Sequence, residues 1–141
     1  MALAALPGSV AGIGTDIVRL ERIVKAYERQ QLKFAQRILG EQELAVFHQR
    51  LARDASRGMR YLATRFAAKE AFSKAIGLGM HSPMSWTRMQ VLNQSSGKPE
   101  ISLSEPLAAW YAGRYGAAHV SLTDESDIVM AFVVLESRPP A

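Results

Sequence analysis

The order of segments along the chain is the strongest constraint on its fold, because helical patterns come first and strand patterns second. After a predicted strand at 10–18, apolar residues recur at helical spacing in three stretches, about 20–27, 32–52 and 60–77. The second half instead alternates like strands over 86–94, 100–104, 118–127 and 128–136, with one short helix from Glu105 to about Arg114. Helices followed by antiparallel strands predict an α+β fold.

The chain reads as one domain. Its 141 residues match the length of a single domain, and no repeat, linker or low-complexity tract interrupts them. We assign residues 10–136 to this domain, residues 1–9 to an N-terminal extension, and residues 137–141 to a flexible tail.

Composition excludes several classes of protein. The chain has no cysteine, which rules out disulfide scaffolds, thiolate metal sites and cysteine nucleophiles. The longest apolar run, Ile128–Leu135, is far shorter than the ~20 residues that span a bilayer. The first 18 residues contain no Lys or Arg, unlike a secretory signal. We therefore expect a cytoplasmic protein that does not enter the membrane.

Positive charge is concentrated in the first half of the chain. Residues 1–74 hold 13 basic and 7 acidic side chains, whereas residues 75–141 hold 4 basic and 6 acidic ones. One stripe of basic residues would follow a single helix face if helix persists through it: Arg19, Arg22, Lys25, Arg29, Lys33 and Arg37. A solvated face is one interpretation of this stripe, and an acidic helical partner or RNA are the functional ones.

Common catalytic motifs are missing. The segment GIGTDI lacks the third glycine of a dinucleotide-binding fingerprint, and the chain has no phosphate-binding P-loop, GxSxG or HExxH motif. Its histidines, His48, His81 and His119, are too dispersed to indicate a zinc site.

Three residues stand out as candidates for chemistry. Asp16, where a strand meets a helix, is either a helix N-cap or a carboxylate at a metal or phosphate site. Glu70 and Lys74 share a helix face with small residues, which fits either a surface ion pair or a ligand site. Two carboxylates without soft ligands would suit Mg²⁺.

Two further segments could bind an anion. The SSGKP turn at 95–99 is either a plain hairpin turn or a loop that brings Lys98 to a phosphate. In the strand HVSLT, His119, Ser121 and Thr123 share one side, which either faces solvent or lines an anion site.

These segments occur together, and in the same order, in one known family. GIGTDIV (12–18), the basic first helix, RFAAKEAFSKAIG (65–77), SGKP (96–99) and HVSLTDE (119–125) closely resemble holo-[acyl-carrier-protein] synthase. This is the small bacterial type of 4'-phosphopantetheinyl transferase. The resemblance spans Val10 to Glu136 and departs from the family pattern in the long N-terminal extension and in DESDIV after HVSLT.

The resemblance implies a fold, an activity and partners. The fold is an α+β homotrimer with N-terminal helices packed on an antiparallel sheet and coenzyme A bound between subunits. The activity transfers the 4'-phosphopantetheine group of coenzyme A to a serine of apo acyl carrier protein, which leaves adenosine 3',5'-bisphosphate and supports fatty acid biosynthesis. A carrier of secondary metabolism is a second possible substrate. A non-enzymatic RNA-binding module remains the alternative from another class, although the resemblance implies no nucleic-acid partner.

The resemblance also assigns roles to residues. Asp16 and Glu70 match the residues that hold Mg²⁺, and Lys74 matches a lysine at the pyrophosphate, so we expect these three to be catalytic. The expected coenzyme A contacts are Arg65, Ser96, Gly97, Lys98, Pro99, His119 and Ser121. The expected docking surface for the acidic carrier is Arg19, Arg22, Lys25 and Arg29.

Overall fold

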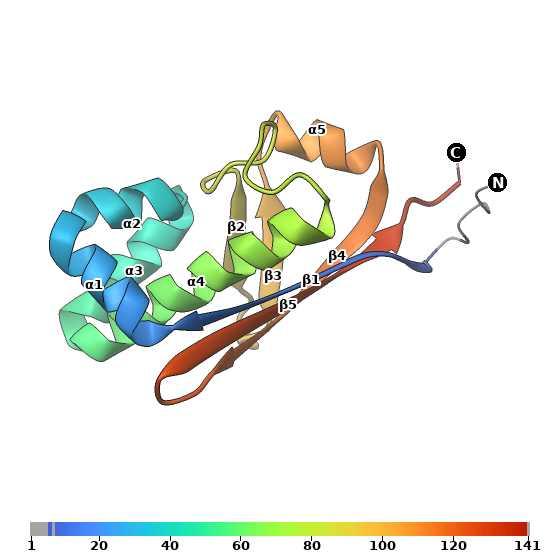
Figure 1. Cartoon of the computed structure of the whole chain (residues 1–141). Coiled ribbons are helices and arrows are strands. Elements are labelled where there is room, and N and C mark those ends of the chain that lie inside the picture. The colour runs from blue at the N-terminus through green and yellow to red at the C-terminus, as the bar shows by residue number, and fades with distance from the viewer. Residues whose placement is uncertain (1–5, 7, 141) are drawn as a thin grey trace.

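The computed structural model describes Leu6 and residues 8–140, and its helices gather on one face of an antiparallel sheet (Figure 1). The helices are α1 (Leu20–Gln30), α2 (Leu32–Ile38), α3 (Glu41–Arg53), α4 (Ala55–Ala75) and α5 (Leu107–Ala112). The strands are β1 (Val10–Arg19), β2 (Met89–Asn93), β3 (Pro99–Leu103), β4 (Tyr115–Asp124) and β5 (Ile128–Ser137). The predicted α+β fold is confirmed.

Two antiparallel sheets form. The larger has the order β1-β5-β4, so the first and last strands of the chain are neighbours, and β2 pairs with β3 in a separate hairpin. Alternate residues of β5 are buried against α4, namely Val129, Ala131, Val133 and Leu135. Within the described residues, no helix is both long enough and apolar enough to cross a membrane.

Both ends of the domain differ from the expected boundaries. Strand β5 extends through Ser137, which is buried. Ser137 therefore belongs to the sheet and not to the expected flexible tail. The backbone N–H of Ser137 donates to the Ser9 carbonyl at 2.7 Å, so the last residues of the expected extension are fixed to the sheet. Residues 1–5, 7 and 141, which we assigned to the extension and the tail, lie outside the described residues.

Helix α4 lies across the large sheet at the centre of the fold (Figure 1), and most of its residues are buried. It begins earlier than predicted because the Asp54 side chain caps it, accepting from the backbone N–H groups of Ser56 and Arg57. Strand β1 approaches α4 very closely. A Cβ added to Gly14 would lie 1.9 Å from the Ala71 carbonyl oxygen, and one on Gly12 would lie 2.5 Å from that of Ala75.

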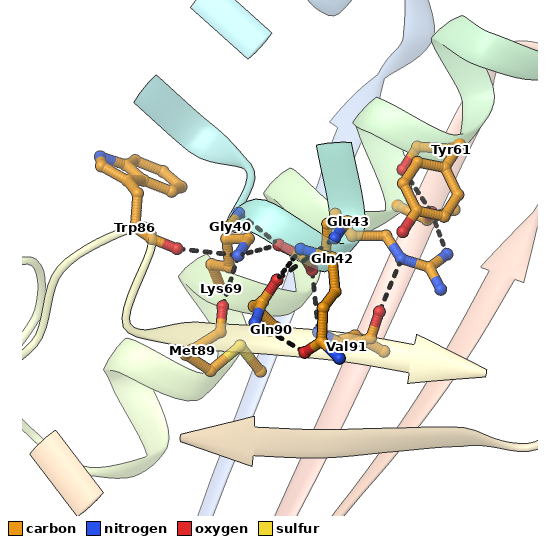
Figure 2. A network of polar contacts seen from close by, with 11 residues as sticks. Gly40, Gln42, Glu43, Tyr61, Lys69, Trp86, Met89, Gln90 and Val91 are labelled. Atoms are coloured by element: carbon orange, nitrogen blue, oxygen red, sulfur yellow. Dashed lines mark hydrogen bonds and ion pairs between the residues drawn. The ribbon is translucent and has the colours of Figure 1, made fainter. Parts of the chain in front are cut away.

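A buried ion pair joins α4 to α3 and β2 (Figure 2). Lys69 Nζ lies 2.7 Å from Glu43 Oε1, and both side chains are fully buried. The ammonium also donates to the carbonyls of Trp86 and Met89, while Glu43 accepts from the backbone N–H groups of Gly40 and Val91. Burial lowers the pKa of Lys69, and the Glu43 carboxylate opposes that shift. Because every polar atom of the pair is satisfied, it can lie inside the core.

The contact between β1 and α4 yields a stability prediction. Gly14→Ala should lower the free energy of unfolding by about 3 kcal/mol, because the new methyl group meets backbone that cannot move aside. Urea unfolding measures this loss. Gly113→Ala is the matched control, since its Cβ would meet only ordinary contacts at 3.6 Å or more. Equal stability of the two variants would contradict the account of this contact.

Candidate active site

Strand β1 and helix α4 bring together the three residues expected to be catalytic. Asp16 lies within β1, which continues to Arg19, and Arg19 rather than Asp16 is the N-cap of α1. The N-cap interpretation of Asp16 is therefore wrong. Lys74 Nζ lies 3.3 Å from Asp16 Oδ1 and donates to the Thr15 carbonyl at 3.0 Å. Glu70 lies one helical turn before Lys74 on α4.

The charge of Asp16 reaches Glu70, so the two carboxylates lie near each other. Burial raises the pKa of Glu70, and the negative charge of Asp16 raises it further. The positive charges of Lys74 and Arg22 act in the opposite direction but do not cancel the shift. The site therefore holds two acidic groups whose repulsion is only partly compensated.

The chemistry of these donors fits Mg²⁺. Among the described residues, no group of three or more His, Cys, Asp or Glu side chains could enclose a metal ion by itself. Mg²⁺ is usually held by one or two carboxylates and completed by waters and substrate phosphates, so a closed protein cage is not required. Asp16 and Glu70 would supply such a pair of hard oxygen ligands.

The basic surface of α1 begins beside this site. The Arg22 guanidinium lies 5.2 Å from the centroid of the Phe66 ring, and its charge reaches Glu70. The expected docking residues Arg19, Arg22, Lys25 and Arg29 are all exposed, and Lys25 pairs with Glu21 at 2.8 Å. The longer stripe does not form, because Gln31 has a φ of 51° and ends α1 before Lys33 and Arg37.

A second, strongly basic site lies toward the other end of α4. It is a cavity of about 1090 Å³ between α3, α4, the β2–β3 hairpin and β4. The arginines that line it are Arg50, Arg53, Arg57, Arg60 and Arg65. We call it the arginine cavity. Sequence reasoning missed all of these except Arg65, although Arg50, Arg53, Arg57 and Arg60 recur at intervals of three or four residues.

Only some of the expected coenzyme A contacts meet in the arginine cavity. Arg65, Gly97, Pro99 and Ser121 line it, whereas Ser96, Lys98 and His119 are not among its lining residues. His119 instead lies with Nε2 2.5 Å from Glu136 Oε2.

Arg65 is buried, and its N–H groups already have protein partners. It donates to the Val91 carbonyl at 3.2 Å, to Asn93 Oδ1 at 3.0 Å and to Thr64 Oγ1 at 3.2 Å. Its guanidinium also lies 4.0 Å from the centroid of the Tyr61 ring. Within this chain Arg65 therefore joins β2 to α4 and shapes the cavity wall.

The two sites are separated along α4. Arg57 precedes Glu70 by 13 positions on α4, which corresponds to about 20 Å at the rise of an α-helix, whereas Arg65, at the near end of the cavity, precedes it by five positions, or about 7.5 Å. Within one chain, the far end of the arginine cavity therefore does not lie next to Asp16 and Glu70.

The face of the large sheet that points away from α4 carries exposed apolar side chains. Ile13 and Ile17 of β1 are each 60% exposed, and Met130 and Phe132 of β5 are about 40% exposed. Ile17 lies opposite Met130 and Thr15 lies opposite Phe132, so the two strands present one continuous patch. We call these four side chains the apolar sheet face.

Comparisons with known proteins agree with this architecture. Residues 12–133 match the model of the 4'-phosphopantetheinyl transferase superfamily. The holo-[acyl-carrier-protein] synthase of Bordetella parapertussis is 58% identical over 135 residues, which cover 96% of this chain and 88% of the relative.

Solved structures are similar as well. The enzyme of that name from Neisseria meningitidis matches with a TM-score of 0.83 and 41% identity over 91% of this chain and 99% of the other. That from Bacillus anthracis, in complex with CoA (3',5'-ADP), matches with a TM-score of 0.76 and 37% identity over 91% and 97% of the two chains.

The raised pKa of Glu70 yields a prediction about stability and pH. A carboxyl whose pKa is higher in the folded state destabilises the fold while it is ionised, above that pKa, and this cost disappears as the pH falls through it. Glu70→Gln should therefore stabilise the fold at pH 7, by about 0.5 kcal/mol because solvent screens a half-exposed group.

Urea unfolding at several pH values measures this effect. The gain should shrink as the pH is lowered toward 4, where Glu70 of the wild type becomes protonated about as fully in both states. Glu100→Gln, at an exposed position of β3, is the control and should show no such gain. A Glu70→Gln variant that is less stable than wild type at pH 7 would refute the repulsion between Glu70 and Asp16.

Proposed function

We propose that this chain transfers the 4'-phosphopantetheine group of coenzyme A to a serine of apo acyl carrier protein. The reason is that the chain belongs to the 4'-phosphopantetheinyl transferase superfamily. The second product is adenosine 3',5'-bisphosphate. The observation that carries the proposal is the meeting of Asp16, Glu70 and Lys74 at the contact between β1 and α4. The high identity to synthases of this name over nearly the whole chain supports it.

The chain's own residues fit the steps of this transfer. The serine oxygen of the carrier attacks the β-phosphorus of coenzyme A, and the bond to the bridging oxygen of the pyrophosphate breaks. Such transfers depend mainly on positioning and on stabilising negative charge. The Lys74 ammonium, 54% exposed beside Asp16, can turn toward the pyrophosphate as its charge increases. Glu70 is our candidate acceptor for the serine proton, since its raised pKa increases its proton affinity.

Asp16 and Glu70 are the residues that would hold Mg²⁺. When bound, Mg²⁺ neutralises charge on the pyrophosphate oxygens. The partly compensated repulsion between the two carboxylates supports this role, because a cation would relieve it.

Coenzyme A would place its nucleotide part in the arginine cavity. The cavity is large enough for a nucleotide, and its arginines match the several negative charges of coenzyme A. Arg65, Gly97, Pro99 and Ser121 contribute to its walls. For Ser96, Lys98 and His119 a contact with coenzyme A stays a prediction from the sequence resemblance.

A homotrimer with active sites between subunits would unite the two sites. Arg57 of the arginine cavity lies about 20 Å before Glu70 along α4, so a neighbouring chain is a natural source of arginines closer to the Asp16–Glu70 pair. The apolar sheet face supports self-association, because a continuous exposed apolar patch commonly marks an interface.

The apo acyl carrier protein would dock on the exposed basic face of α1. Arg19, Arg22, Lys25 and Arg29 offer positive charge to an acidic helix, and Arg22 links this surface to Glu70. The pair between Lys25 and Glu21 makes Lys25 the weakest of the four, since part of its charge is already balanced.

The transfer itself is tested by mass spectrometry. Incubation with coenzyme A and Mg²⁺ should increase the mass of an apo carrier by one phosphopantetheine group. Asp16→Ala and Glu70→Gln should lower the rate by about 100-fold or more, since each removes half of the carboxylate pair. Glu100→Gln, which removes an exposed carboxylate on β3, should transfer at the wild-type rate. Near wild-type transfer by Asp16→Ala or Glu70→Gln would refute their assigned role.

The site between subunits is tested by complementation. Glu70→Gln and the double variant Arg53→Ala/Arg57→Ala should each transfer poorly at limiting coenzyme A. Co-expressed and purified together, they should recover up to about a quarter of wild-type activity, because random pairing joins an intact Glu70 to an intact arginine cavity in that share of interfaces. Activity equal to the mean of the two variants would place both halves of the site in one chain.

A further inference from the structure

The turn between β4 and β5, residues 124–127, lies between the arginine cavity and the proposed docking helix α1. We call it the β4–β5 turn. Its cavity side is Asp124, which lines the arginine cavity. Its other side is Asp127, whose carbonyl accepts from the backbone N–H of Leu20 at 2.8 Å. The turn therefore touches both surfaces that the proposed function uses.

Arg60 holds the β4–β5 turn at three points. Its Nη1 donates to Asp124 Oδ1 at 2.6 Å and to the Glu125 carbonyl at 2.7 Å, and its Nη2 donates to the Ser126 carbonyl at 2.7 Å. Arg60 itself belongs to α4, and its Nε donates to Ser56 Oγ of the same helix at 3.3 Å. A planar guanidinium bound at several points fixes the position of its partner much better than a single flexible contact.

The bond from Leu20 transmits this constraint to α1. The first N–H groups of a helix have no partner within the helix, and the N-cap residue Arg19 makes no side-chain cap bond. The Asp127 carbonyl supplies a partner at this position. The start of α1 is thus tied, next to the last β1–β5 pair of Arg19 and Ile128, to a turn that Arg60 holds against α4.

Arg60 differs in this from its neighbours in the arginine cavity. Among the described residues, the side chains of Arg53 and Arg57 make no hydrogen bond or ion pair with the protein. Their charges are available to an anion, whereas the Arg60 charge is already opposed by Asp124 at 2.6 Å. Arg60 therefore has a structural role, whereas Arg53 and Arg57 face the cavity.

We propose that Arg60 is a positioning residue for carrier docking, which acts through the β4–β5 turn on the start of α1. This inference rests on the proposed docking of the carrier to α1. Arg60 does not touch the carrier or the reacting atoms. It sets the direction in which α1 presents its basic side chains, although it lies in the wall of the coenzyme A cavity.

The test compares Arg60→Ala with Arg57→Ala, the neighbouring arginine of the same helix and cavity. Arg60→Ala should raise the KM for the apo carrier about fivefold and change kcat little, because one set of charged hydrogen bonds is lost. Arg57→Ala should raise the KM for coenzyme A and leave that for the carrier unchanged. Arg60→Lys keeps the charge but has no fork, and should give an intermediate KM for the carrier.

Amide hydrogen exchange at Leu20 measures directly how firmly the start of α1 is held, and it does not require enzyme turnover. The Leu20 amide should exchange about tenfold faster in Arg60→Ala than in wild type, and at the wild-type rate in Arg57→Ala. Arg22→Glu is the reference for lost docking: it should raise the KM for the carrier without changing exchange at Leu20.

The outcomes separate this proposal from the proposed function. Unchanged exchange at Leu20 in Arg60→Ala, or a rise in the KM for coenzyme A alone, would overturn the positioning role. Wild-type protein that transfers nothing to an apo carrier would overturn the proposed function, while the exchange result would stand. Circular dichroism on Arg60→Lys and Arg60→Ala shows whether each variant folds.

Discussion

Strand β1 and helix α4 touch backbone to backbone, and this close contact determines how the catalytic candidates meet. Gly12 and Gly14 let the strand backbone lie against the carbonyls of Ala75 and Ala71, where any side chain would collide. The next residue on that strand face is Asp16, and the alanines of α4 alternate with Glu70 and Lys74. The same small residues that close the core therefore bring two carboxylates and an ammonium group together. Burial raises the pKa of Glu70 and the negative charge of Asp16 raises it further, so the site is held together by packing elsewhere.

That packing is supplied by the other faces of α4. Lys69 and Glu70 are adjacent in sequence but point about 100° apart around the helix, so they contact different parts of the structure. Lys69 enters the core and pairs with Glu43, which fixes α3 and β2 (Figure 2). Glu70 faces Asp16 at the surface of the fold. Arg65 joins β2 to α4 from a third direction, and Arg60 joins the β4–β5 turn to it. One helix thus positions both halves of the proposed site and the turn that leads to the docking surface.

Much of this could be predicted from the sequence, and the exceptions have physical causes. The α+β order was predictable from local pattern, whereas the grouping of Asp16, Glu70 and Lys74 was predictable only from the resemblance to a known family. The extent of β1 was not, since pairing with β5 from the far end of the chain extends the strand through Asp16 to Arg19. The basic stripe was overextended because a single residue, Gln31, turns the chain between two helical patterns.

The arginine cavity was missed because it spans the junction of α3 and α4, and Lys69 resembled any other charged residue on a helix. The apolar sheet face was missed because alternating strands normally bury one side and expose the other, and here both sides are apolar.

The proposed function requires that Asp16 and Glu70 form one cation site rather than two independent acidic groups. The most direct test is a double-mutant cycle on Mn²⁺ affinity, measured by electron paramagnetic resonance with coenzyme A present, for wild type, Asp16→Asn, Glu70→Gln and the double variant. If the two carboxylates form one site, either single change removes nearly all of the affinity, so that the double variant binds no more weakly than either single one. Losses that simply add, or wild-type affinity in either single variant, would contradict it.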